Sequence, residues 1–240
     1  MNLDINLARR LVQYAKRAYA DNPCAAKIGA SCTVFYSPLT DAEFFVEYVG
    51  DNLILTFRGS QSAEDFEQDG RFIRTDVDGL GIHKGFWQDI SSVDGKIFSI
   101  IKDAGKPVIF TGHSLGADLA LLAAWLCARQ NLPVLSVYAF APARPGNAAF
   151  RDNYNKLLYD RTFCFENRDD PVPQIPFLFM GARRVGQLVY LTSPGHFKIN
   201  PPTWFIAKKN IFGAFSAWRQ GRKALFPNHK IDKYITNLAA

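Results

Sequence analysis

Long hydrophobic runs are absent from this chain of 240 residues, since no window approaches the roughly 18 consecutive apolar residues that a membrane-spanning helix needs. The chain also lacks Gly/Ser-rich or Pro-rich linkers, and it has no internal repeat with a period of roughly 20 to 50 residues. These absences exclude a solenoid and a helical membrane protein. Because 48% of the residues are apolar and 21% are charged, we expect residues 1–240 to form one domain around a sizeable core.

Cysteine is scarce, and no two cysteines form a C-x-x-C pair, which argues against a zinc cluster or a redox pair. Cys32, Cys127 and Cys164 lie in apolar stretches, so the sequence favours buried, reduced thiols at these positions. The sequence also leaves open a bridge between Cys24 and Cys32.

A secretory signal of the Sec type is also missing from the first ten residues. They carry Asp4 and two arginines, where such a signal would have a basic start followed by an apolar run. We therefore expect a cytoplasmic protein, or one that is exported by a signal-less route.

Positive charge is unevenly distributed along the chain. The net charge of +6 arises in residues 203–240, which carry seven basic side chains and one acidic one, whereas residues 1–202 are balanced at 21 of each. A basic segment of this kind can attract an anionic membrane surface, a nucleic acid or an acidic partner, or form a solvated helix face. No RNA- or DNA-binding motif accompanies it, so we do not expect a nucleic-acid partner.

The apolar pattern predicts an α/β fold. We expect helices where apolar residues recur every three or four positions, and strands where β-branched and aromatic residues form short runs. The expected helices cover residues 7–18, 85–104, 115–130, 148–158 and 231–238, and the expected strands cover residues 31–36, 43–49, 53–57, 107–110, 134–140, 161–165 and 187–191. The first three strands are typical of an antiparallel start, and the later apolar strands alternate with helices. This order indicates a mostly parallel central sheet with helices on both faces.

Residues 112–116 (GHSLG) contain the candidate nucleophile, Ser114. They lie between an apolar strand and a helix, which is the setting that a G-x-S-x-G nucleophile elbow requires. The two glycines leave room for a strained turn, and the serine begins a helix whose N–H groups favour developing negative charge. The five-residue pattern alone is weak evidence, because it can occur by chance. Its position between a strand and a helix supports the prediction, because the elbow requires that setting.

A serine nucleophile needs a base, and the base needs an orienting carboxylate. The order serine, acid, histidine along an α/β-hydrolase chain disfavours His83 and leaves His196 and His229. Asp170 follows a predicted strand and is held extended by the next proline, and Asp169 is the alternative acid. A solvated Asp-Asp turn is the structural alternative for both. His113 is expected to point away from the serine.

Several motifs in this order resemble the class 3 lipases, a family of α/β-hydrolases that includes secreted fungal triacylglycerol lipases. The similar stretches are residues 57–62 (FRGSQS), Asp65-Phe66 with Asp69, residues 83–86 (HKGF), residues 112–116 (GHSLG), residues 170–176 (DPVPQIP) and residues 229–234 (HKIDKY). The resemblance implies that His229 is the base and Asp170 the acid. It also implies an oxyanion hole made by the backbone N–H groups of Ser60 and Leu115, with no metal or organic cofactor.

The sequence departs from the family pattern at three points. Asp118 stands where the family has a small apolar residue, and we expect this carboxylate to favour the start of the helix. Phe66 replaces a tryptophan. The fungal members are secreted and disulfide-bonded, which the sequence does not predict for this chain. His83 is expected to be a buried histidine that anchors the loop before the next helix.

Two segments are candidates for covering the site. Residues 62–78 match the family's lid but are mostly polar. Residues 203–226 interleave aromatic and aliphatic side chains with lysine and arginine, the composition of a helix that lies in a membrane interface. We expect residues 203–226 to form a second lid or a peripheral docking element, and the alternative is a core helix with solvated lysines.

The sequence therefore predicts a serine carboxylic-ester hydrolase, a triacylglycerol lipase that acts through an acyl-enzyme on Ser114. A phospholipase or a short-chain carboxylesterase with the same triad is the first alternative. The remote alternative is an inactive hydrolase fold whose basic, aromatic C-terminal segment binds membrane.

Overall fold

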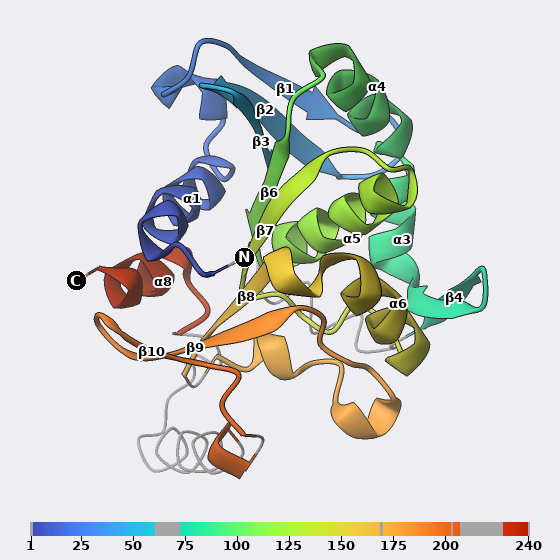
Figure 1. Cartoon of the computed structure of the whole chain (residues 1–240), viewed down its shortest axis with the longest axis vertical. Coiled ribbons are helices and arrows are strands. Elements are labelled where there is room, and N and C mark those ends of the chain that lie inside the picture. The colour runs from blue at the N-terminus through green and yellow to red at the C-terminus, as the bar shows by residue number, and fades with distance from the viewer. Residues whose placement is uncertain (1, 61–72, 169, 203, 207–227, 240) are drawn as a thin grey trace.

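The computed structural model describes residues 2–60, 73–168, 170–202, 204–206 and 228–239, and Figure 1 shows the arrangement of their elements. The central sheet has the strand order β1-β2-β3-β6-β7-β8-β9-β10. Its strands are β1 (Cys32–Tyr36), β2 (Glu43–Val49), β3 (Asn52–Phe57), β6 (Val108–His113), β7 (Val134–Phe140), β8 (Thr162–Asn167), β9 (Gln187–Ser193) and β10 (His196–Ile199). Strands β3, β6, β7, β8 and β9 are parallel, and antiparallel pairs flank them at both edges. The predicted fold class is confirmed.

Helices cover both faces of the sheet, as the alternating strands and helices predicted. On one face lie α3 (Lys84–Ser91), α4 (Asp94–Ala104), α5 (Leu115–Arg129) and α6 (Ala148–Leu158), and on the other lie α1 (Ile5–Arg17) and α8 (Ile231–Leu238) (Figure 1). Each face has its own buried core, and β6 contributes to both, because Phe110 packs toward α5 while Ile109 packs toward α1. No helix in the described ranges is long and apolar enough to cross a membrane.

The structure divides one expected helix and adds small elements. Residues 85–104 form two helices because the Ser92 hydroxyl donates to the Asp89 carbonyl and Val93 leaves the helical conformation. The added elements are the hairpin of β4 (Arg74–Val77) and β5 (Leu80–His83), the edge strand β10, and the short helices η1 (Pro23–Ala26), η2 (Tyr159–Arg161), η3 (Val172–Gln174) and η4 (Leu178–Met180).

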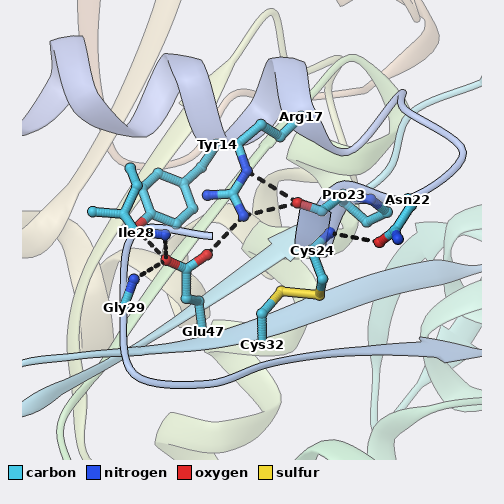
Figure 2. Close-up of a disulfide and its surroundings, with 9 residues drawn as sticks. All are labelled: Tyr14, Arg17, Asn22, Pro23, Cys24, Ile28, Gly29, Cys32 and Glu47. Carbon is cyan, nitrogen blue, oxygen red and sulfur yellow. Dashed lines mark hydrogen bonds and ion pairs between the residues drawn. A yellow bond between two sulfur atoms is a disulfide. The ribbon is translucent and has the colours of Figure 1, made fainter. Parts of the chain in front are cut away.

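The expectation of a reduced thiol at Cys32 is wrong, because Cys32 forms a disulfide with Cys24 (Figure 2). Asn22 caps η1 and turns the chain back against β1, which brings the two Cα atoms within 5.5 Å. Cys127 and Cys164 are free and buried, as expected.

The loop closed by this disulfide is held by the fully buried carboxylate of Glu47 on β2 (Figure 2). Glu47 accepts hydrogen bonds from the backbone N–H groups of Ile28 and Gly29, from the Arg17 guanidinium at 2.7 Å and from the Tyr14 hydroxyl at 3.2 Å. Burial raises the pKa of Glu47, but the donors outweigh burial and leave the pKa below its usual value. The N-terminal helix is thereby fixed to the sheet through a charged, hydrogen-bonded group.

Candidate active site

Ser114 lies in the turn that joins β6 to α5, and its backbone is strained, with φ of 58° and ψ of −131°. The turn requires both of its glycines. A Cβ on Gly112 would lie 2.2 Å from the Gly116 carbonyl oxygen, and a Cβ on Gly116 would lie 2.3 Å from the Phe57 carbonyl oxygen. The close approach of strand, turn and helix therefore presents Ser114 at the end of the sheet, as the GHSLG pattern predicted.

His229 joins Ser114 to Asp170 through two hydrogen bonds. Its Nε2 lies 2.9 Å from Ser114 Oγ, and its Nδ1 lies 3.1 Å from Asp170 Oδ2. Ser114 is 4% exposed, His229 5% and Asp170 3%, so water has little access to these bonds. Because the carboxylate can only accept, Nδ1 carries the proton and Nε2 accepts from the serine hydroxyl. This is the order of groups that a serine nucleophile needs.

The other candidates for base and acid lie elsewhere. His196 is exposed on β10, where its Nδ1 contacts the Pro194 carbonyl. His83 is half-buried and caps α3, accepting from the Phe86 N–H at 3.4 Å, so its expected anchoring role has a physical basis. Asp169 lies outside the described residues.

Asp170 is supported by donors that the sequence did not identify. Tyr234 on α8 donates to Asp170 Oδ2 at 2.5 Å, and the Val172 N–H donates to Oδ1 at 3.0 Å. Burial, followed by the charge of Asp170, raises the pKa of Tyr234 well above its usual value, so the phenol remains a donor. Tyr234 ends the stretch that resembles the family motif, and only the structure shows that its hydroxyl reaches the acid.

Asn167 at the end of β8 connects the acid to the segment that carries His229. Its side-chain Nδ2 donates to the Asn228 carbonyl at 3.1 Å, and its Oδ1 accepts from Asn237 at 2.6 Å. Its backbone N–H contacts the Tyr234 hydroxyl at 3.0 Å. One buried amide therefore holds both ends of α8 against the strand that leads to Asp170.

His113 supports the base from behind, and its side chain points away from the serine as expected. Its Nε2 lies 2.8 Å from the His229 carbonyl oxygen, and its Nδ1 lies 2.8 Å from the Tyr19 hydroxyl. Burial, followed by the proximity of His229, lowers the pKa of His113 well below its usual value, so the ring is neutral. A carbonyl can only accept, so Nε2 carries the proton and Nδ1 accepts from Tyr19.

The two residues expected to form the oxyanion hole leave adjacent strands at the same edge of the sheet. Phe57 at the end of β3 pairs with Gly112 on β6. Ser60 follows the first of these strands, and Ser114 and Leu115 follow the second. Leu115 is the first residue of α5, so its N–H belongs to the helical turn whose donors have no partner within the helix. Both residues are half-buried.

Asp118, one turn into α5, differs from the expectation of a carboxylate that favours the helix start. It is fully buried, and its Oδ2 accepts from the Ala143 N–H at 3.0 Å. Its Oδ1 is buried without a hydrogen-bond partner among the described residues. Burial raises the pKa of Asp118 well above its usual value, which disfavours the anion that would stabilise the start of the helix.

The loop after Asp170 is fixed by Arg144, which the sequence did not single out. The buried guanidinium of Arg144 donates to the Gln174 carbonyl, to the Gln174 side chain at 3.0 Å and to the Pro176 carbonyl at 2.7 Å. Gln174 in turn donates to Glu166, which pairs with Arg184. The charged cluster therefore holds residues 171–176 beside the candidate acid.

The two candidate covering segments are only partly described. Of residues 62–78, the part up to residue 72 lies outside the described ranges. Of residues 203–226, only residues 204–206 are described: Trp204 is 68% exposed, whereas Ile206 is buried against β9. The expected second lid or docking element stays a prediction.

Comparison with known proteins identifies the family. The family model described as Lipase (class 3) matches residues 54–180. Secreted mono- and diacylglycerol lipase A of Penicillium cyclopium is 32% identical over 214 residues, covering 77% of this chain and 70% of the relative. The structure resembles mono- and diacylglycerol lipase from Aspergillus oryzae with a TM-score of 0.72 and 26% identity, over 83% of this chain and 86% of the other. Rhizomucor miehei triacylglyceride lipase, at 20% identity and a TM-score of 0.74, covers 81% and 83% and supports the fold alone.

These relatives correct the expected location. The similar proteins from Penicillium cyclopium, Fusarium solani and Malassezia restricta are all named secreted lipases. Their names contradict the expectation of a cytoplasmic protein and point to export. The Cys24–Cys32 disulfide agrees with them, because such bonds persist in oxidising compartments.

The family match also gives the general activity. The matched residues 54–180 include the elbow with Ser114 and the loop with Asp170, and the relatives are named lipases. The chain therefore belongs to the class 3 lipase family, and it is a carboxylic-ester hydrolase with the α/β-hydrolase fold that acts on lipid esters.

Proposed function

We propose that this lipase is exported and hydrolyses acylglycerols by two-step acyl transfer, with Ser114 as nucleophile, His229 as base and Asp170 as the residue that orients the base. The observation that carries the proposal is the buried series of hydrogen bonds from Ser114 Oγ through His229 to Asp170. A serine hydroxyl at its ordinary pKa is a weak nucleophile, and an adjacent base in the correct tautomer activates it.

In the first step, Ser114 Oγ attacks the ester carbonyl carbon while His229 Nε2 takes the hydroxyl proton. The N–H groups of Ser60 and Leu115 stabilise the negative charge that develops on the carbonyl oxygen, and each donor of this kind contributes roughly 3 kcal/mol. The bond to the glycerol oxygen then breaks, and His229 returns its proton to that oxygen. The alcohol leaves, and the acyl group remains on Ser114.

In the second step, water repeats the attack on the acyl-enzyme. His229 takes a proton from the water, the tetrahedral intermediate collapses, and the proton returns to Ser114 Oγ as the fatty acid leaves. Throughout, Asp170 accepts from His229 Nδ1 and stabilises the imidazolium, while Tyr234 and Val172 hold the carboxylate in place.

For the substrate, we propose mono- and diacylglycerols ahead of triacylglycerol. The similar proteins from Penicillium cyclopium and Aspergillus oryzae carry these substrates in their names, and the match to the first covers 77% of this chain. This preference replaces the sequence-based expectation of a lipase that acts mainly on triacylglycerol. Phospholipase and short-chain carboxylesterase activities are the alternatives that a substrate profile tests.

The test has two parts. A fluorophosphonate probe should label the wild-type protein covalently at Ser114, and Ser114→Ala should abolish labelling. Fatty acid release is then measured from monoolein, diolein, triolein, phosphatidylcholine and p-nitrophenyl butyrate, with the first two expected to be hydrolysed fastest. Labelling that persists in Ser114→Ala would overturn the assignment of the nucleophile, and faster release from phosphatidylcholine or from butyrate would overturn the substrate class.

A further inference from the structure

Phe177, Leu178 and Phe179 form a continuous apolar surface outside the hydrogen-bonded site. Their exposed fractions are 50%, 45% and 87%. Single exposed apolar residues are ordinary, but large neighbouring ones are typical of a contact surface. We call residues 177–180 the apolar finger.

The backbone of the apolar finger is held in a defined shape. The Met180 N–H donates to the Phe177 carbonyl at 2.9 Å, and Gly181 closes the turn in the left-handed region with φ of 82°. Arg183 donates to the Leu178 carbonyl at 3.0 Å, and Arg74 donates to the Met180 carbonyl. The carbonyls of Phe177, Leu178 and Met180 therefore have partners, which lowers the cost of moving this part of the backbone out of water.

The apolar side chains are stacked on this support. The rings of Phe177 and Phe179 lie 5.5 Å apart with an interplanar angle of 10°. A preformed aromatic pair loses little conformational freedom when it is buried. Exposed aromatic residues beside arginines are the composition of elements that rest in a lipid–water interface.

The finger lies on the same side of the molecule as the candidate active site. It directly follows the loop that begins at Asp170, and Arg144 fixes the last residue of that loop through the Pro176 carbonyl. In Figure 1, the two short light-orange helices, η3 and η4, lie in the lower half of the molecule, toward which the parallel strands β6, β7 and β8 run. A surface resting on the finger would therefore face the end of the sheet that carries Ser114.

We propose that the apolar finger docks this lipase on the surface of its aggregated lipid substrate, with Phe177 and Phe179 inserted among acyl chains. The proposal rests on the proposed acylglycerol function, because that substrate forms a lipid surface. The guanidinium groups of Arg74 and Arg183 hold the backbone of the finger through the Met180 and Leu178 carbonyls. This element is distinct from residues 203–226.

The test compares Phe177→Ser/Phe179→Ser with Ile28→Ser. Ile28 is 69% exposed and lies beside the Cys24–Cys32 disulfide, far from the finger along the chain, so it is a matched loss of an exposed apolar side chain. Binding is measured by sedimentation with dioleoylphosphatidylcholine vesicles that contain diolein, in the Ser114→Ala background. The finger variant should bind about tenfold more weakly or worse, because two buried aromatic side chains are lost from the lipid contact. Ile28→Ser should bind like the parent.

Activity distinguishes docking from damage to the site. With Ser114 present, the finger variant should lose about tenfold or more of its activity on emulsified diolein, and its activity on dissolved p-nitrophenyl butyrate should stay within about twofold. Phe179→Trp should retain vesicle binding, because tryptophan also favours an interface.

Three results would overturn the proposal. They are unchanged vesicle binding by the finger variant, an equal loss on emulsion and on dissolved ester, or a dimer in light scattering that the finger variant abolishes, which would assign the surface to a second copy of the chain. If the wild type hydrolyses neither ester but Ser114→Ala still binds vesicles through the finger, the acyl-transfer proposal fails and the docking proposal stands.

Discussion

Asp170 and Asp118 are both buried carboxyl groups near the candidate nucleophile, and they differ in the number of their hydrogen-bond donors. Asp118 is close to Ser114 along the chain, and Asp170 is close to it in space. Asp170 accepts from His229, Tyr234 and the Val172 N–H. Asp118 accepts from the Ala143 N–H, and its second oxygen has no hydrogen-bond partner in the part of the chain that the structure describes. Burial disfavours a charge, and donors or a cation are what restore it.

Glu47, far from the site, extends the comparison. It is as buried as Asp118, yet it accepts from two backbone amides, an arginine and a tyrosine, and its pKa lies below the usual value, whereas that of Asp118 lies well above. The pKa values of these two buried carboxyl groups are therefore shifted in opposite directions, and the difference follows their donors.

The largest expected difference is in activity. Asp170→Asn should lower kcat on dissolved p-nitrophenyl butyrate by roughly 10⁴-fold, because an amide that donates to His229 favours the wrong tautomer, the effect known for the corresponding aspartate of serine proteases. Asp118→Asn should retain activity within about tenfold, since Asn Oδ1 can still accept from the Ala143 N–H. Circular dichroism of both variants checks that the fold persists. Comparable losses in the two variants would contradict the distinction.

The difference between these carboxyl groups shows what the sequence could and could not predict. Ser114 and Asp170 lie in local patterns, a strand followed by a glycine-flanked turn and an Asp-Pro step after a strand, so their placement follows from neighbours in the chain. His229 was separated from His196 only by the family resemblance. These local signals gave the fold class and the order of the site.

The remaining features depend on contacts between distant segments. The burial of Asp118 requires the Ala143 loop to pass over α5, and the donor to Asp170 comes from Tyr234, 64 residues away along the chain. The Cys24–Cys32 bond depends on the turn at η1. Periodicity and composition carry no information on such contacts. From the sequence we therefore expected Asp118 to be a helix-stabilising carboxylate and Cys32 to be reduced.

Glu47→Gln tests the carboxylate that has several hydrogen-bond donors and lies away from the site. Removing the charge that faces Arg17 should lower the free energy of unfolding by about 3 kcal/mol at pH 7, near the lower bound for breaking a buried ion pair. The lowered pKa means that the ionised group stabilises the fold above pH ~4.5 and that this contribution is lost as the pH falls. Urea unfolding at pH 7 and at pH 3.5 should therefore show a smaller cost at the lower pH. An equal cost at both values would attribute the loss to packing.

Tyr234→Phe removes one donor from Asp170, so that this carboxyl group, like Asp118, has fewer hydrogen bonds. A hydrogen bond to a charged group contributes about 1.5–3 kcal/mol, so kcat on the dissolved ester should fall roughly 10- to 100-fold with little change in KM. The control is Tyr19→Phe, which removes a hydrogen bond to His113, one contact further from the base, and should cost less than about tenfold. Equal effects of the two variants would contradict the special position of Tyr234.

The smallest effect concerns the pH dependence of stability, where Asp118 should act with the opposite sign to Glu47. The raised pKa means that folded Asp118 keeps its proton above pH ~4 while the unfolded chain loses it. Its contribution to stability is therefore complete below that pH and is lost as the pH rises toward the folded-state pKa, at about 1.4 kcal/mol per pH unit. Asp118→Asn removes this slope, so the difference in unfolding free energy between the variant and the wild type should increase by that amount for each unit, measured by urea unfolding from pH 4.5 to 6.5. A constant difference over this range would mean that Asp118 is ionised in the folded protein, and that a single backbone donor suffices to hold a buried charge.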